Sequence, residues 1–535
     1  MKRKAFGWSS LFCAGMVLMA SCSSQSGNTS EDNGEASAPG DVTAYEPDSS
    51  TTYEIDWMPY ITEPIDQDGK MVTYYEDKFN VDFNMVNVDH ANIQELLNLK
   101  FASGEIPDVM LDGVSSDTIQ QLVKQGVLLS LDEEVLKETM PDLYSKATEL
   151  NPNWLEFAKV DDKIYGLPEM RDVYKYRTTI VWRGDWLENV GINKTPETLE
   201  EFEEALYKFT FEDPDQNGED DTYGISLSGI PAIFGAFGYL PGYGPHDWQD
   251  WFWQERDGEM VFGAIQPEAK EALALLNKWY EDGVLDPEFI TGENTGGYWA
   301  LSHAFINGKI GFTGHGQYYH WNDELKNGDI GANYDEIQKI SQEVADSLVH
   351  GLPPKGPGGM NLFAPNMLSG KIVGFSRYLE EEPQKLGKIF EILNHTSGTT
   401  KENNIEAVMG IEGEMWEENE DGIRKMLPEW EDVMDTGAGK FNLELGVFDL
   451  YEIRGDWAVE HGYDKGTLRN ALFKPLPSES TYREELTKIR DEAYISMITG
   501  DQPIDAFDQF VEQWMNAGGD ILTKEANEWY ATLEK

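Results

Sequence analysis

The residues with the most specific chemistry lie in an acidic segment, residues 213–221, with the sequence DPDQNGEDD. Side-chain oxygens stand at alternate positions and Gly218 follows them, which matches ligand positions one, three and five and the glycine at position six of an EF-hand calcium loop. Ca²⁺ takes six to eight oxygen ligands, and this turn supplies carboxylate, amide and main-chain oxygens. The predicted calcium ligands are Asp213, Asp215, Asn217, Glu219 (through its main-chain carbonyl) and Asp221.

The loop departs from the EF-hand pattern at position twelve, where Gly224 replaces the bidentate glutamate. We therefore expect a shorter calcium loop with a structural role, since saturated oxygen ligation leaves no open position for chemistry. The alternative is a solvated acidic turn in a very acidic chain.

Signatures of catalysis are missing from the sequence. It contains no His-Glu-x-x-His zinc motif, no Gly-x-Ser-x-Gly nucleophile elbow and no P-loop. The eight histidines are scattered, and His315 and His320 have poor spacing for a metal pair on a helix. With 98 acidic residues, a carboxylate pair for glycoside hydrolysis is uninformative. The sequence predicts no enzyme, no catalytic residue and no catalytic cofactor.

Aromatic residues are abundant, with 16 tryptophans in 535 residues. Sugar rings present apolar C–H faces that stack on aromatic rings, while sugar hydroxyls need a few placed polar groups. Single tryptophans are more often core residues, but those beside glycine-rich loops favour stacking platforms. The candidates are Trp248, Trp251 and Trp253 beside Gly242 and Gly244, and Trp299, Tyr318, Tyr319 and Trp321 beside Gly311–Gly316.

Strand and helix patterns alternate in the part of the chain that must position these residues. This alternation predicts an α/β fold with a parallel or mixed sheet covered by helices. Thr195 before Pro196 predicts a helix start, and the Gly311–Gly316 segment predicts a loop after a strand. The predicted strands are 53–59, 81–88, 109–111, 176–182 and 372–375; the predicted helices include 71–79, 93–101, 115–125, 132–139 and 267–280. A body of nearly five hundred residues exceeds one core, so at least two domains are expected.

The N-terminal residues predict export and lipidation. Lys2-Arg3-Lys4 precedes an uncharged stretch, Ala5 to Leu18, which is typical of a signal peptide and too short to span a bilayer. Met19-Ala20-Ser21-Cys22 is similar to a bacterial lipobox, in which Cys22 carries the lipid; the alternative is an ordinary signal with an incidental cysteine. We expect a signal peptide over 1–21, a disordered tether over 22–52 and anchoring at the extracellular face of the cell membrane.

The cysteine count and the charge exclude several classes. Cys13 and Cys22 are the two cysteines, so the mature body has no internal disulfide, thiolate metal site or cysteine nucleophile. The 98 acidic and 41 basic residues give a net charge of −57. Such a field repels nucleic acids and argues mildly against strongly acidic polysaccharides, although the simplest reading is solubility.

Several segments together resemble a known family. Through these segments the chain is similar to the extracellular solute-binding proteins of bacterial carbohydrate importers, especially the large lipoprotein branch of Gram-positive bacteria. The segments are ASGEIPDV (102–109), KIYGLP (163–168), WRGDWL (182–187) running into Thr195-Pro196, the acidic loop, LDPEF (285–289), GKIGF (308–312) and GPGG (356–359). They occur in the family's order from about residue 53 to residue 420, and the last hundred residues match less well.

The resemblance implies a two-lobe fold of the type II periplasmic-binding-protein kind, with a hinge and with ligand held between the lobes. Lobe I is expected to comprise 53–168 and 369–437, and lobe II 169–368 and 438–535. The ligand-binding positions that the resemblance implies follow strand ends: Asp112, Gly113, Glu169, Arg171, His315, Gln317, Tyr318 and Trp321.

The function that follows is capture of a mono- or oligosaccharide by a monomer for import through the permease subunits of an ABC transporter. Two alternatives stay open: an exported enzyme acting on glycans, and a binding protein for a peptide or another nutrient.

Overall fold

The computed structural model describes residues 42–533, with gaps in which nothing is described. The gaps are residues 62, 89–92, 117, 171–178, 241–250, 292–298, 317, 324–329, 361, 364–367, 398–399, 421–423, 431–434, 444–461, 463–466, 469, 473 and 475. The signal peptide, Cys22 and most of the expected tether lie outside the described residues, as do Arg171 and Gln317.

The first sheet has five strands in the order β2-β1-β3-β15-β6. Strand β1 runs parallel to β2 and β3, whereas β15 runs antiparallel to β3 and β6. Along β2 buried and exposed residues alternate, as the two-residue period of a strand requires when one face meets the core. The strands are β1 (Tyr53–Met58), β2 (Val81–Met85), β3 (Val109–Met110), β6 (Leu167–Met170) and β15 (Leu368–Phe375).

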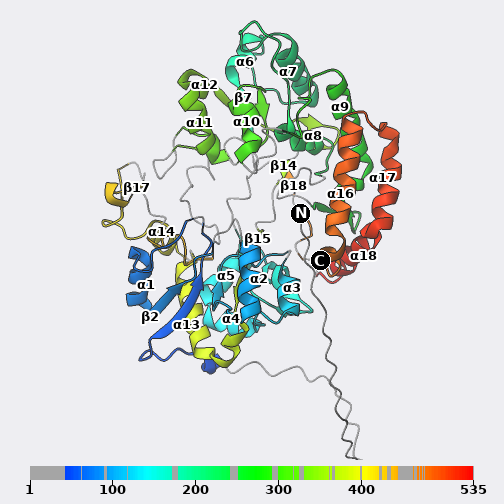
Figure 1. The fold of residues 1–535 in the computed structure, drawn as a ribbon. Coiled ribbons are helices and arrows are strands. Elements are labelled where there is room, and N and C mark those ends of the chain that lie inside the picture. Colours follow the sequence, from blue (N-terminus) through cyan, green and yellow to red (C-terminus); the bar gives the residue numbers. More distant parts are fainter. Residues whose placement is uncertain are drawn as a thin grey trace, which may run out of the picture. The chain divides into compact units, whose positions relative to one another are not determined.

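Helices cover this sheet and bury a core rich in aromatic rings (Figure 1). Trp57 is fully buried, and its ring centroid lies 5.6 Å from that of Phe83 and 5.4 Å from that of Phe441. The helices are α1 (Lys70–Phe79), α2 (Ile93–Ser103), α3 (Ile119–Lys124), α4 (Glu133–Thr139), α5 (Pro141–Leu150), α13 (Pro383–Thr396) and α14 (Lys401–Met409).

A polar cluster joins three of these helices. The carboxylate of Glu406 on α14 accepts from Lys78 Nζ on α1 at 2.7 Å and from the Tyr74 hydroxyl at 3.0 Å. His395 Nε2 on α13 lies 3.1 Å from the same carboxylate. Burial alone would raise the pKa of Glu406, but these hydrogen bonds outweigh it and lower that pKa to about 2.

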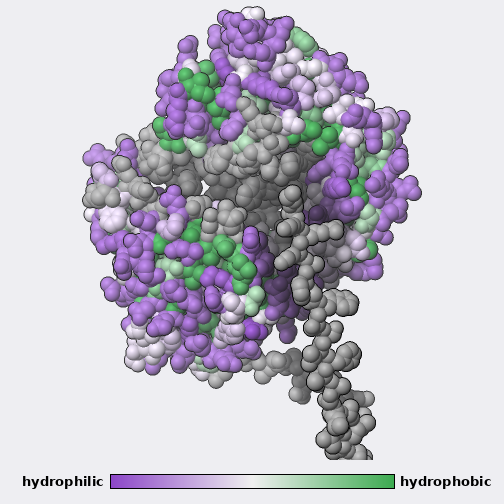
Figure 2. Space-filling view, viewed as in Figure 1, coloured by the Kyte–Doolittle hydropathy of each residue, from purple (hydrophilic) through white to green (hydrophobic). Residues whose placement is uncertain are grey.

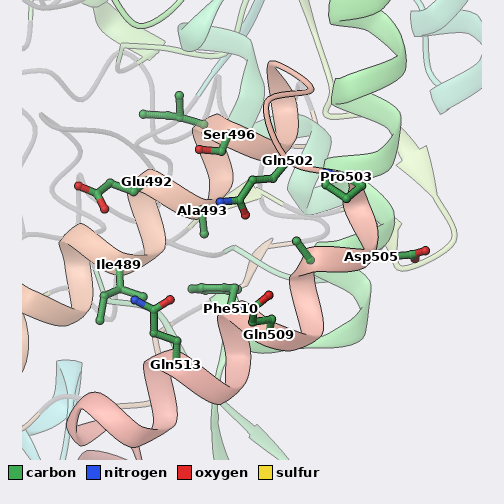
Figure 3. A pocket seen from close by; sticks show the side chains of 12 residues that line it. Ile489, Glu492, Ala493, Ser496, Gln502, Pro503, Asp505, Gln509, Phe510 and Gln513 are labelled. Carbon is green, nitrogen blue, oxygen red and sulfur yellow. The ribbon is translucent and has the colours of Figure 1, made fainter.

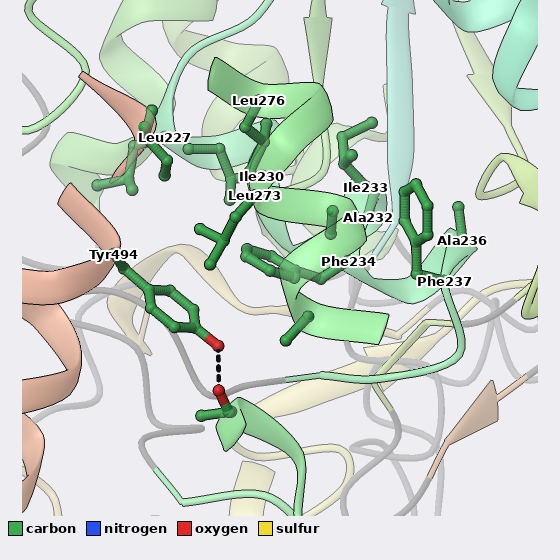
Figure 4. Close-up of a cluster of buried hydrophobic side chains, with 14 of the residues drawn as sticks. Leu227, Ile230, Ala232, Ile233, Phe234, Ala236, Phe237, Leu273, Leu276 and Tyr494 are labelled. Atoms are coloured by element: carbon green, nitrogen blue, oxygen red, sulfur yellow. Dashed lines mark hydrogen bonds between the residues drawn. The ribbon is translucent and has the colours of Figure 1, made fainter. Parts of the chain in front are cut away.

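The second sheet is antiparallel, in the order β10-β7-β11. Helix α8, which packs in the same core, is apolar on all sides. The Tyr494 ring from the C-terminal region lies beside it, and the Tyr494 hydroxyl donates to the Ala264 carbonyl at 2.6 Å (Figure 4). The elements are β7 (Ile180–Arg183), β10 (Phe312–Thr313), β11 (Leu348–Gly351), α6 (Gly184–Asn189), α7 (Leu199–Phe211), α8 (Ile230–Ala236), α9 (Pro267–Glu281), α10 (His303–Ile306), α11 (Ala332–Ile340) and α12 (Gln342–Asp346).

A buried ion pair gives a structural role to two of the segments that carry the family resemblance. Asp286, from the 285–289 segment, is fully buried and lies 3.1 Å from Lys309 Nζ of the 308–312 segment. The Ser226 hydroxyl donates to the same carboxylate at 3.1 Å. A buried carboxylate is tolerated when it is paired and hydrogen-bonded, so these residues hold neighbouring segments in place.

The C-terminal helices pack on the second core. Helices α16 and α17 lie side by side, and a π-helical turn joins α17 to α18 (Figure 1). Gly518 in that turn has a φ of 122° and lies against the Tyr482 ring, where a side chain would collide. The helices are α16 (Glu479–Ile498), α17 (Phe507–Trp514) and α18 (Asp520–Tyr530).

Short two-stranded ribbons complete the described elements. They are β4 (Lys159–Val160) with β5 (Lys163–Ile164), β8 (Trp253–Arg256) with β9 (Glu259–Phe262), β12 (Lys355–Gly356) with β13 (Gly359–Met360), β14 (Leu362–Phe363) with β18 (Thr467–Leu468), and β16 (Trp416–Glu418) with β17 (Arg424–Met426).

The α/β alternation expected from the sequence is confirmed, with local corrections. The N-cap of α7 is Thr198, not Thr195, because Thr198 and Glu201 form a reciprocal capping box. The Gly311–Gly316 segment is not wholly a loop, since Phe312 and Thr313 form β10. The expected helix at 115–125 is shorter, as α3, and the expected strand at 176–182 overlaps β7.

The lobe boundaries stay a prediction. Met170 pairs with β15 in the first sheet, and Ala438, Phe441 and Leu443 belong to the first sheet's core.

Most of the described surface in Figure 2 is hydrophilic, in keeping with the acidic composition. Within the described residues no helix is both long and apolar enough to cross a membrane.

Candidate functional site

Polar side chains gather at one edge of the first sheet. Strands β1 and β3 are parallel, and β6 has the same direction because β15 is antiparallel to both β3 and β6. Their carboxyl ends therefore meet at one edge, together with the first half of β15. Ligands of open α/β sheets bind outside the carboxyl ends of strands. The sequence-predicted residues Asp112 and Glu169 both lie at this edge, after β3 and within the end of β6.

A cavity of about 190 Å³ opens at this edge. We call it the edge cavity. Glu169 faces it and is only 6% exposed. The residues that line the cavity are Tyr60, Leu111, Glu169, Lys371, Ile372, Val373, Gly439, Lys440, Asn442 and Leu443. The sequence had predicted Glu169 alone of these residues.

Two lysines of the edge cavity converge on one tyrosine. Lys371 Nζ lies 3.6 Å from the centroid of the Tyr60 ring, well inside the range of a cation–π contact. Lys440 Nζ donates to the Tyr60 main-chain carbonyl at 3.1 Å and lies 5.9 Å from the ring centroid. The tyrosine follows β1 and the lysines come from β15 and from the 435–443 segment.

The segment that carries Lys440 is fastened to the core on both sides. The Trp57 indole donates to the Lys440 carbonyl at 2.9 Å, and the Phe441 ring packs against Trp57. The Leu443 amide donates to the Ser397 hydroxyl at 3.2 Å. A wall held in this way is preorganised, so little ordering remains to be done when a ligand binds.

Asn442 is the most unusual group in the edge cavity. Its side chain is 5% exposed, and neither its amide nitrogen nor its oxygen has a hydrogen-bond partner among the described residues. An unpaired buried amide costs about 1–3 kcal/mol. Such a group at a cavity wall offers a donor and an acceptor to a ligand.

Asp112 and Gly113 differ in what they can do. Asp112 is 5% exposed and its carboxylate accepts from the Gly113 amide at 2.8 Å. Gly113 has a φ of 80°, and a Cβ there would lie 2.1 Å from Leu97 Cδ1. Gly113 thus shapes the turn after β3, and only Asp112 offers a side chain.

The other predicted ligand residues belong to the second sheet. His315 Nδ1 lies 3.1 Å from the Ser302 hydroxyl, which also accepts from the Asn333 amide at 3.2 Å. Trp321 is 1% exposed, and its indole donates to the His315 carbonyl at 2.9 Å, so it supports this turn from within the core. Tyr318 begins a short 3-10 helix, Tyr318–Trp321.

Besides Trp321, two more of the expected stacking platforms are core residues. Trp251 is 6% exposed and packs against Phe262 with ring centroids 4.9 Å apart, while Trp253 is 1% exposed. Their expectation as exposed platforms is wrong because Trp253, the first residue of β8, and Trp251, just before that strand, both lie in the second core. Trp248 lies outside the described residues.

The acidic loop at 213–221 is folded around one amide. Asn217 Nδ2 donates to Asp215 Oδ2 at 2.9 Å and to Asp221 Oδ1 at 3.2 Å. The Gly218 amide donates to Asp213 Oδ2 at 3.2 Å, and Gly218 has a φ of 83°. Two carboxylates therefore meet at the Asn217 amide, and the third accepts from the main chain of the same turn.

The carboxylates of this loop lie close enough to affect one another's protonation. Burial, with the neighbouring carboxylates of Asp213 and Asp221, raises the pKa of Asp215 above its usual value. Within the described residues, however, no group of three or more His, Cys, Asp or Glu side chains is arranged to hold a metal ion. The carboxylate and carbonyl oxygens of the loop are the ligand types that calcium prefers. Asn217 adds an amide oxygen, and asparagine is not one of the four residue types named above.

A match to a family model decides the broad class of the protein. Residues 70–358, more than half of the chain, match the family described as bacterial extracellular solute-binding protein. The chain belongs to this family. Members of this family are binding proteins, and the family is extracellular.

Two curated relatives of this solute-binding protein come from Bacillus subtilis (strain 168). It is 26% identical over 477 residues to the lipoprotein LipO, covering 83% of this chain and 85% of LipO. It is 23% identical over 499 residues to the polygalacturonan/rhamnogalacturonan-binding protein YtcQ, covering 90% of this chain and 92% of YtcQ.

Solved structures show that the solute-binding protein has the two-lobe α/β fold. An HMO-binding solute-binding protein from Bifidobacterium longum infantis aligns with a TM-score of 0.64 at 14% identity, covering 90% of this chain and 98% of that one. The alginate-binding protein AlgQ2, solved without calcium ion, gives 0.60 at 16%, with coverages of 90% and 98%. An EF-hand mutant of the Streptococcus pneumoniae protein FusA, in complex with fructo-nystose, gives 0.61 at 17%, with coverages of 90% and 99%.

A second hollow in the solute-binding protein lies far along the chain. A groove of about 820 Å³ runs between α16 and α17, with Glu492, Gln509 and Gln513 along it (Figure 3). Its lining contains none of the residues that the sequence singled out.

Proposed function

We propose that this chain captures a carbohydrate outside the cell and delivers it to the permease subunits of an ABC importer. The observation that carries the proposal is the edge cavity at the carboxyl edge of the first sheet, which is lined by the buried Glu169 carboxylate and by the Asn442 amide, whose side chain has no partner among the described residues. The names of YtcQ, of AlgQ2 and of the Bifidobacterium protein support a carbohydrate as the ligand class.

The chemistry of the edge cavity suits hydroxyl groups. Glu169 accepts hydrogen bonds from sugar hydroxyls, and Asn442 both donates and accepts. Asp112 at the neighbouring strand end adds a further acceptor. The other predicted ligand contacts are Arg171, His315, Gln317 and Tyr318. Trp321, also predicted from the sequence, would support the His315 turn from the core.

Titration of the mature chain with a panel of neutral and acidic oligosaccharides and short peptides tests this function. We expect tryptophan fluorescence or the melting temperature to respond to at least one saccharide and not to peptides. Asn442→Ala should weaken the binding by about tenfold, because it removes a buried donor and acceptor. Asn403→Ala on α14 is the matched control, since it removes an amide that does not line the cavity. A response to peptides alone would overturn the proposal.

We also propose that the 213–221 loop holds Ca²⁺ through Asp213, Asp215, Asn217, the Glu219 carbonyl and Asp221. The carboxylates that meet at Asn217 and the raised pKa of Asp215 support it. The ion would replace the hydrogen bonds that Asn217 now makes and would tie α7 to the segment before Tyr223.

Addition of calcium after chelation should raise the melting temperature, and the double substitution Asp213→Asn with Asp215→Asn should remove the rise. Asp220→Asn is the control, because that exposed side chain is outside the ligand set. If calcium stabilises the double variant as well as the parent, the loop is only a solvated turn.

The proposed location is the extracellular face of the cell membrane, with the lipid on Cys22. The support is the sequence pattern of residues 2–22 and the lipoprotein LipO among the relatives. Expression of Cys22→Ser should release the protein from the membrane fraction; retention of that variant would contradict the anchor.

A further inference from the structure

The first described residues of the chain pack on the first core. Residues 42–52, which we call the clasp, begin with a short 3-10 helix, Val42–Tyr45, that contacts α13 and α4. The Tyr45 side chain is partly buried against the first core. This burial, with the nearby carboxylates of Asp132 and Glu380, raises the pKa of Tyr45. The chain is therefore in contact with the core before its first strand begins.

A glycine in α13 makes room for the clasp. Gly387 is buried in the interior of the helix, a position where glycine is less favourable than alanine. A Cβ here would collide with the main-chain carbonyl oxygen of Tyr45. The main chain of the clasp therefore lies closer to α13 than any side chain at position 387 would allow.

Hydrogen bonds hold the other end of the clasp. The Asp48 amide donates to the Tyr53 hydroxyl at 2.9 Å. Asn80 Nδ2 donates to the Thr51 carbonyl at 2.9 Å, and the Thr52 hydroxyl donates to Asn80 Oδ1 at 3.2 Å. Asn80 ends α1 in the left-handed conformation, with a φ of 54°. The clasp is thus attached at both of its ends.

These contacts place the clasp at the amino edge of the first sheet, opposite the edge cavity. Tyr53 pairs with Val81 where β1 and β2 begin. Strand β15 is antiparallel to β3, so it ends at this edge and α13 follows it there. Because a strand rises about 3.3 Å per residue, the span of β1 from Tyr53 to Met58 separates the two edges by about 17 Å.

Helix α13 is itself joined to the sheet. Lys385 Nζ lies 2.6 Å from the Asp108 carboxylate, which also accepts from the Asp56 amide at 2.9 Å. Asp108 directly precedes β3 and Asp56 lies in β1, so one carboxylate links the helix to two strands. Both side chains of the ion pair are largely buried, and breaking a buried pair is costly. The clasp therefore docks on an element that is fixed to the first sheet.

We propose that the clasp fixes both the length of the lipid tether and the place where it leaves the protein. The inference rests on the proposed lipid anchor at Cys22. The clasp begins 20 positions after Cys22, and this stretch spans at most about 70 Å. Without the clasp, the tether would run 31 positions, to Tyr53. The mean span of a flexible chain grows with the square root of its length, so it would increase by about a quarter.

The position of the clasp has a consequence for saccharide capture. The tether leaves from the amino edge of the first sheet, whereas the edge cavity lies at the carboxyl edge. A solute therefore reaches the cavity from the side opposite the anchor. To present the same edge to a permease in the membrane, the protein must turn, and a tether of 20 residues leaves it free to do so.

Hydrogen exchange measured by mass spectrometry tests whether the clasp docks. The parent is the mature chain with Cys22→Ser, which cannot carry the lipid. We expect the amides of residues 48–51 to exchange at least about tenfold more slowly than in a free peptide of the same sequence, because exchange requires the clasp to open. Gly387→Leu should abolish this protection, since the new side chain takes the place of the Tyr45 carbonyl.

Asn80→Gly opens the clasp from its other end. Glycine keeps the left-handed backbone at the end of α1 and removes both side-chain hydrogen bonds, so protection of the clasp should fall while the fold is retained. Asp257→Gly is the matched control, which should leave the protection unchanged. Asp257 is exposed, also has a φ of 54°, and lies in the turn between β8 and β9.

Energy transfer in phosphatidylcholine vesicles tests the length of the tether. The lipidated chain carries a dye on an introduced cysteine, Asp82→Cys near the start of β2, and the bilayer carries the acceptor. No cysteine follows Cys22, so the labelling is specific. Gly387→Leu should lower the transfer, because its tether is longer. Deletion of 11 residues from the 23–41 stretch of the same variant, the length that the released clasp adds, should restore it.

Each outcome is decisive. Rapid exchange of residues 48–51 in the parent, or protection that survives in both Gly387→Leu and Asn80→Gly, overturns docking of the clasp. Transfer that is unchanged in Gly387→Leu overturns its control of the tether. If thermal melting shows that Gly387→Leu is unfolded, Asn80→Gly serves in both experiments.

Failure of the proposed function gives different results. Saccharide affinity should equal that of the parent in every clasp variant, because no residue of the edge cavity is changed. A parent that binds no saccharide overturns capture and leaves the exchange result intact. Retention of Cys22→Ser in the membrane fraction overturns the anchor, and with it the role of the clasp in the tether, but not its docking.

Discussion

The acidic loop and the edge cavity are two polar sites built in opposite ways. The loop takes all its side chains from nine consecutive residues, 213–221, and its geometry follows from local turns. The edge cavity draws on Tyr60, Glu169, Lys371 and Asn442, which come from segments far apart in the chain. A local site depends on the sequence around it, whereas an assembled site depends on the core that brings its parts together.

The largest effect that separates the two sites is expected from Trp57→Ala. The indole is fully buried, packs against Phe441 and holds the Lys440 carbonyl. Its loss should lower the free energy of unfolding by about 3–5 kcal/mol and weaken saccharide binding, measured by chemical denaturation and titration.

Trp57→Phe is the matched control, because it keeps an aromatic ring and loses the hydrogen bond to Lys440. It should cost less stability than the alanine variant. The calcium response of both variants should equal that of the parent at temperatures where they are folded; a lost response would show that the loop, too, depends on the first core.

A smaller effect is expected from Glu406→Gln, which tests the first core by pH. The folded pKa is lowered to about 2 from an ordinary value of 4.5, so the ion pairs stabilise the fold above pH 4.5 and are lost as the pH falls through about 2. After allowance for partial exposure we expect a deficit of about 1–2 kcal/mol at pH 7.

Denaturation curves between pH 7 and pH 2 measure this deficit, which should vanish at the acid end. Glu414→Gln is the control, because its pair with Lys70 is half exposed and should contribute under 1 kcal/mol at any pH. A deficit in Glu406→Gln that is the same at all pH values would contradict the assignment.

The smallest effect is expected from Thr198→Ala, at the start of the helix that leads into the acidic loop. Loss of the capping box should cost about 1 kcal/mol of stability, with little change in affinity for saccharide. Thr195→Ala should cost less, since Thr195 does not cap α7. A larger loss at Thr195 in thermal or chemical denaturation would restore the cap position that the sequence first suggested.

The same contrast explains what could be predicted from the sequence. The strand at Tyr53–Met58, helix α1 and the alternate ligands of the acidic loop each depend on neighbouring residues, so periodicity and spacing were enough to find them. The Thr198 cap was also visible, because Glu201 follows it by three residues, but the Thr195-Pro196 pair suggested an earlier start.

The residues that were missed share a physical reason. Lys371 and Lys440 carry no motif, and their importance comes from a common contact with Tyr60 that only the folded sheet creates. The interpretation of Trp251 and Trp253 as platforms fails because glycine neighbours suggest exposure, whereas both indoles lie in the second core. Whether His315 and Tyr318 contact the ligand stays a prediction.

The hydrogen bond between Trp57 and Lys440 has a consequence for how the protein comes into being. It joins residues 383 positions apart. The entropic cost of loop closure rises by only about 0.6 kcal/mol for each doubling of length, so the long span lowers the stability of the folded protein little. Contacts between residues so far apart in sequence nevertheless form slowly. A chain that leaves the cell N-terminus first therefore exposes β1 long before Phe441 can cover it. The first core can be completed only when the last quarter of the chain is present. A protein truncated before residue 440 should therefore remain in an aggregation-prone state instead of folding as a smaller domain.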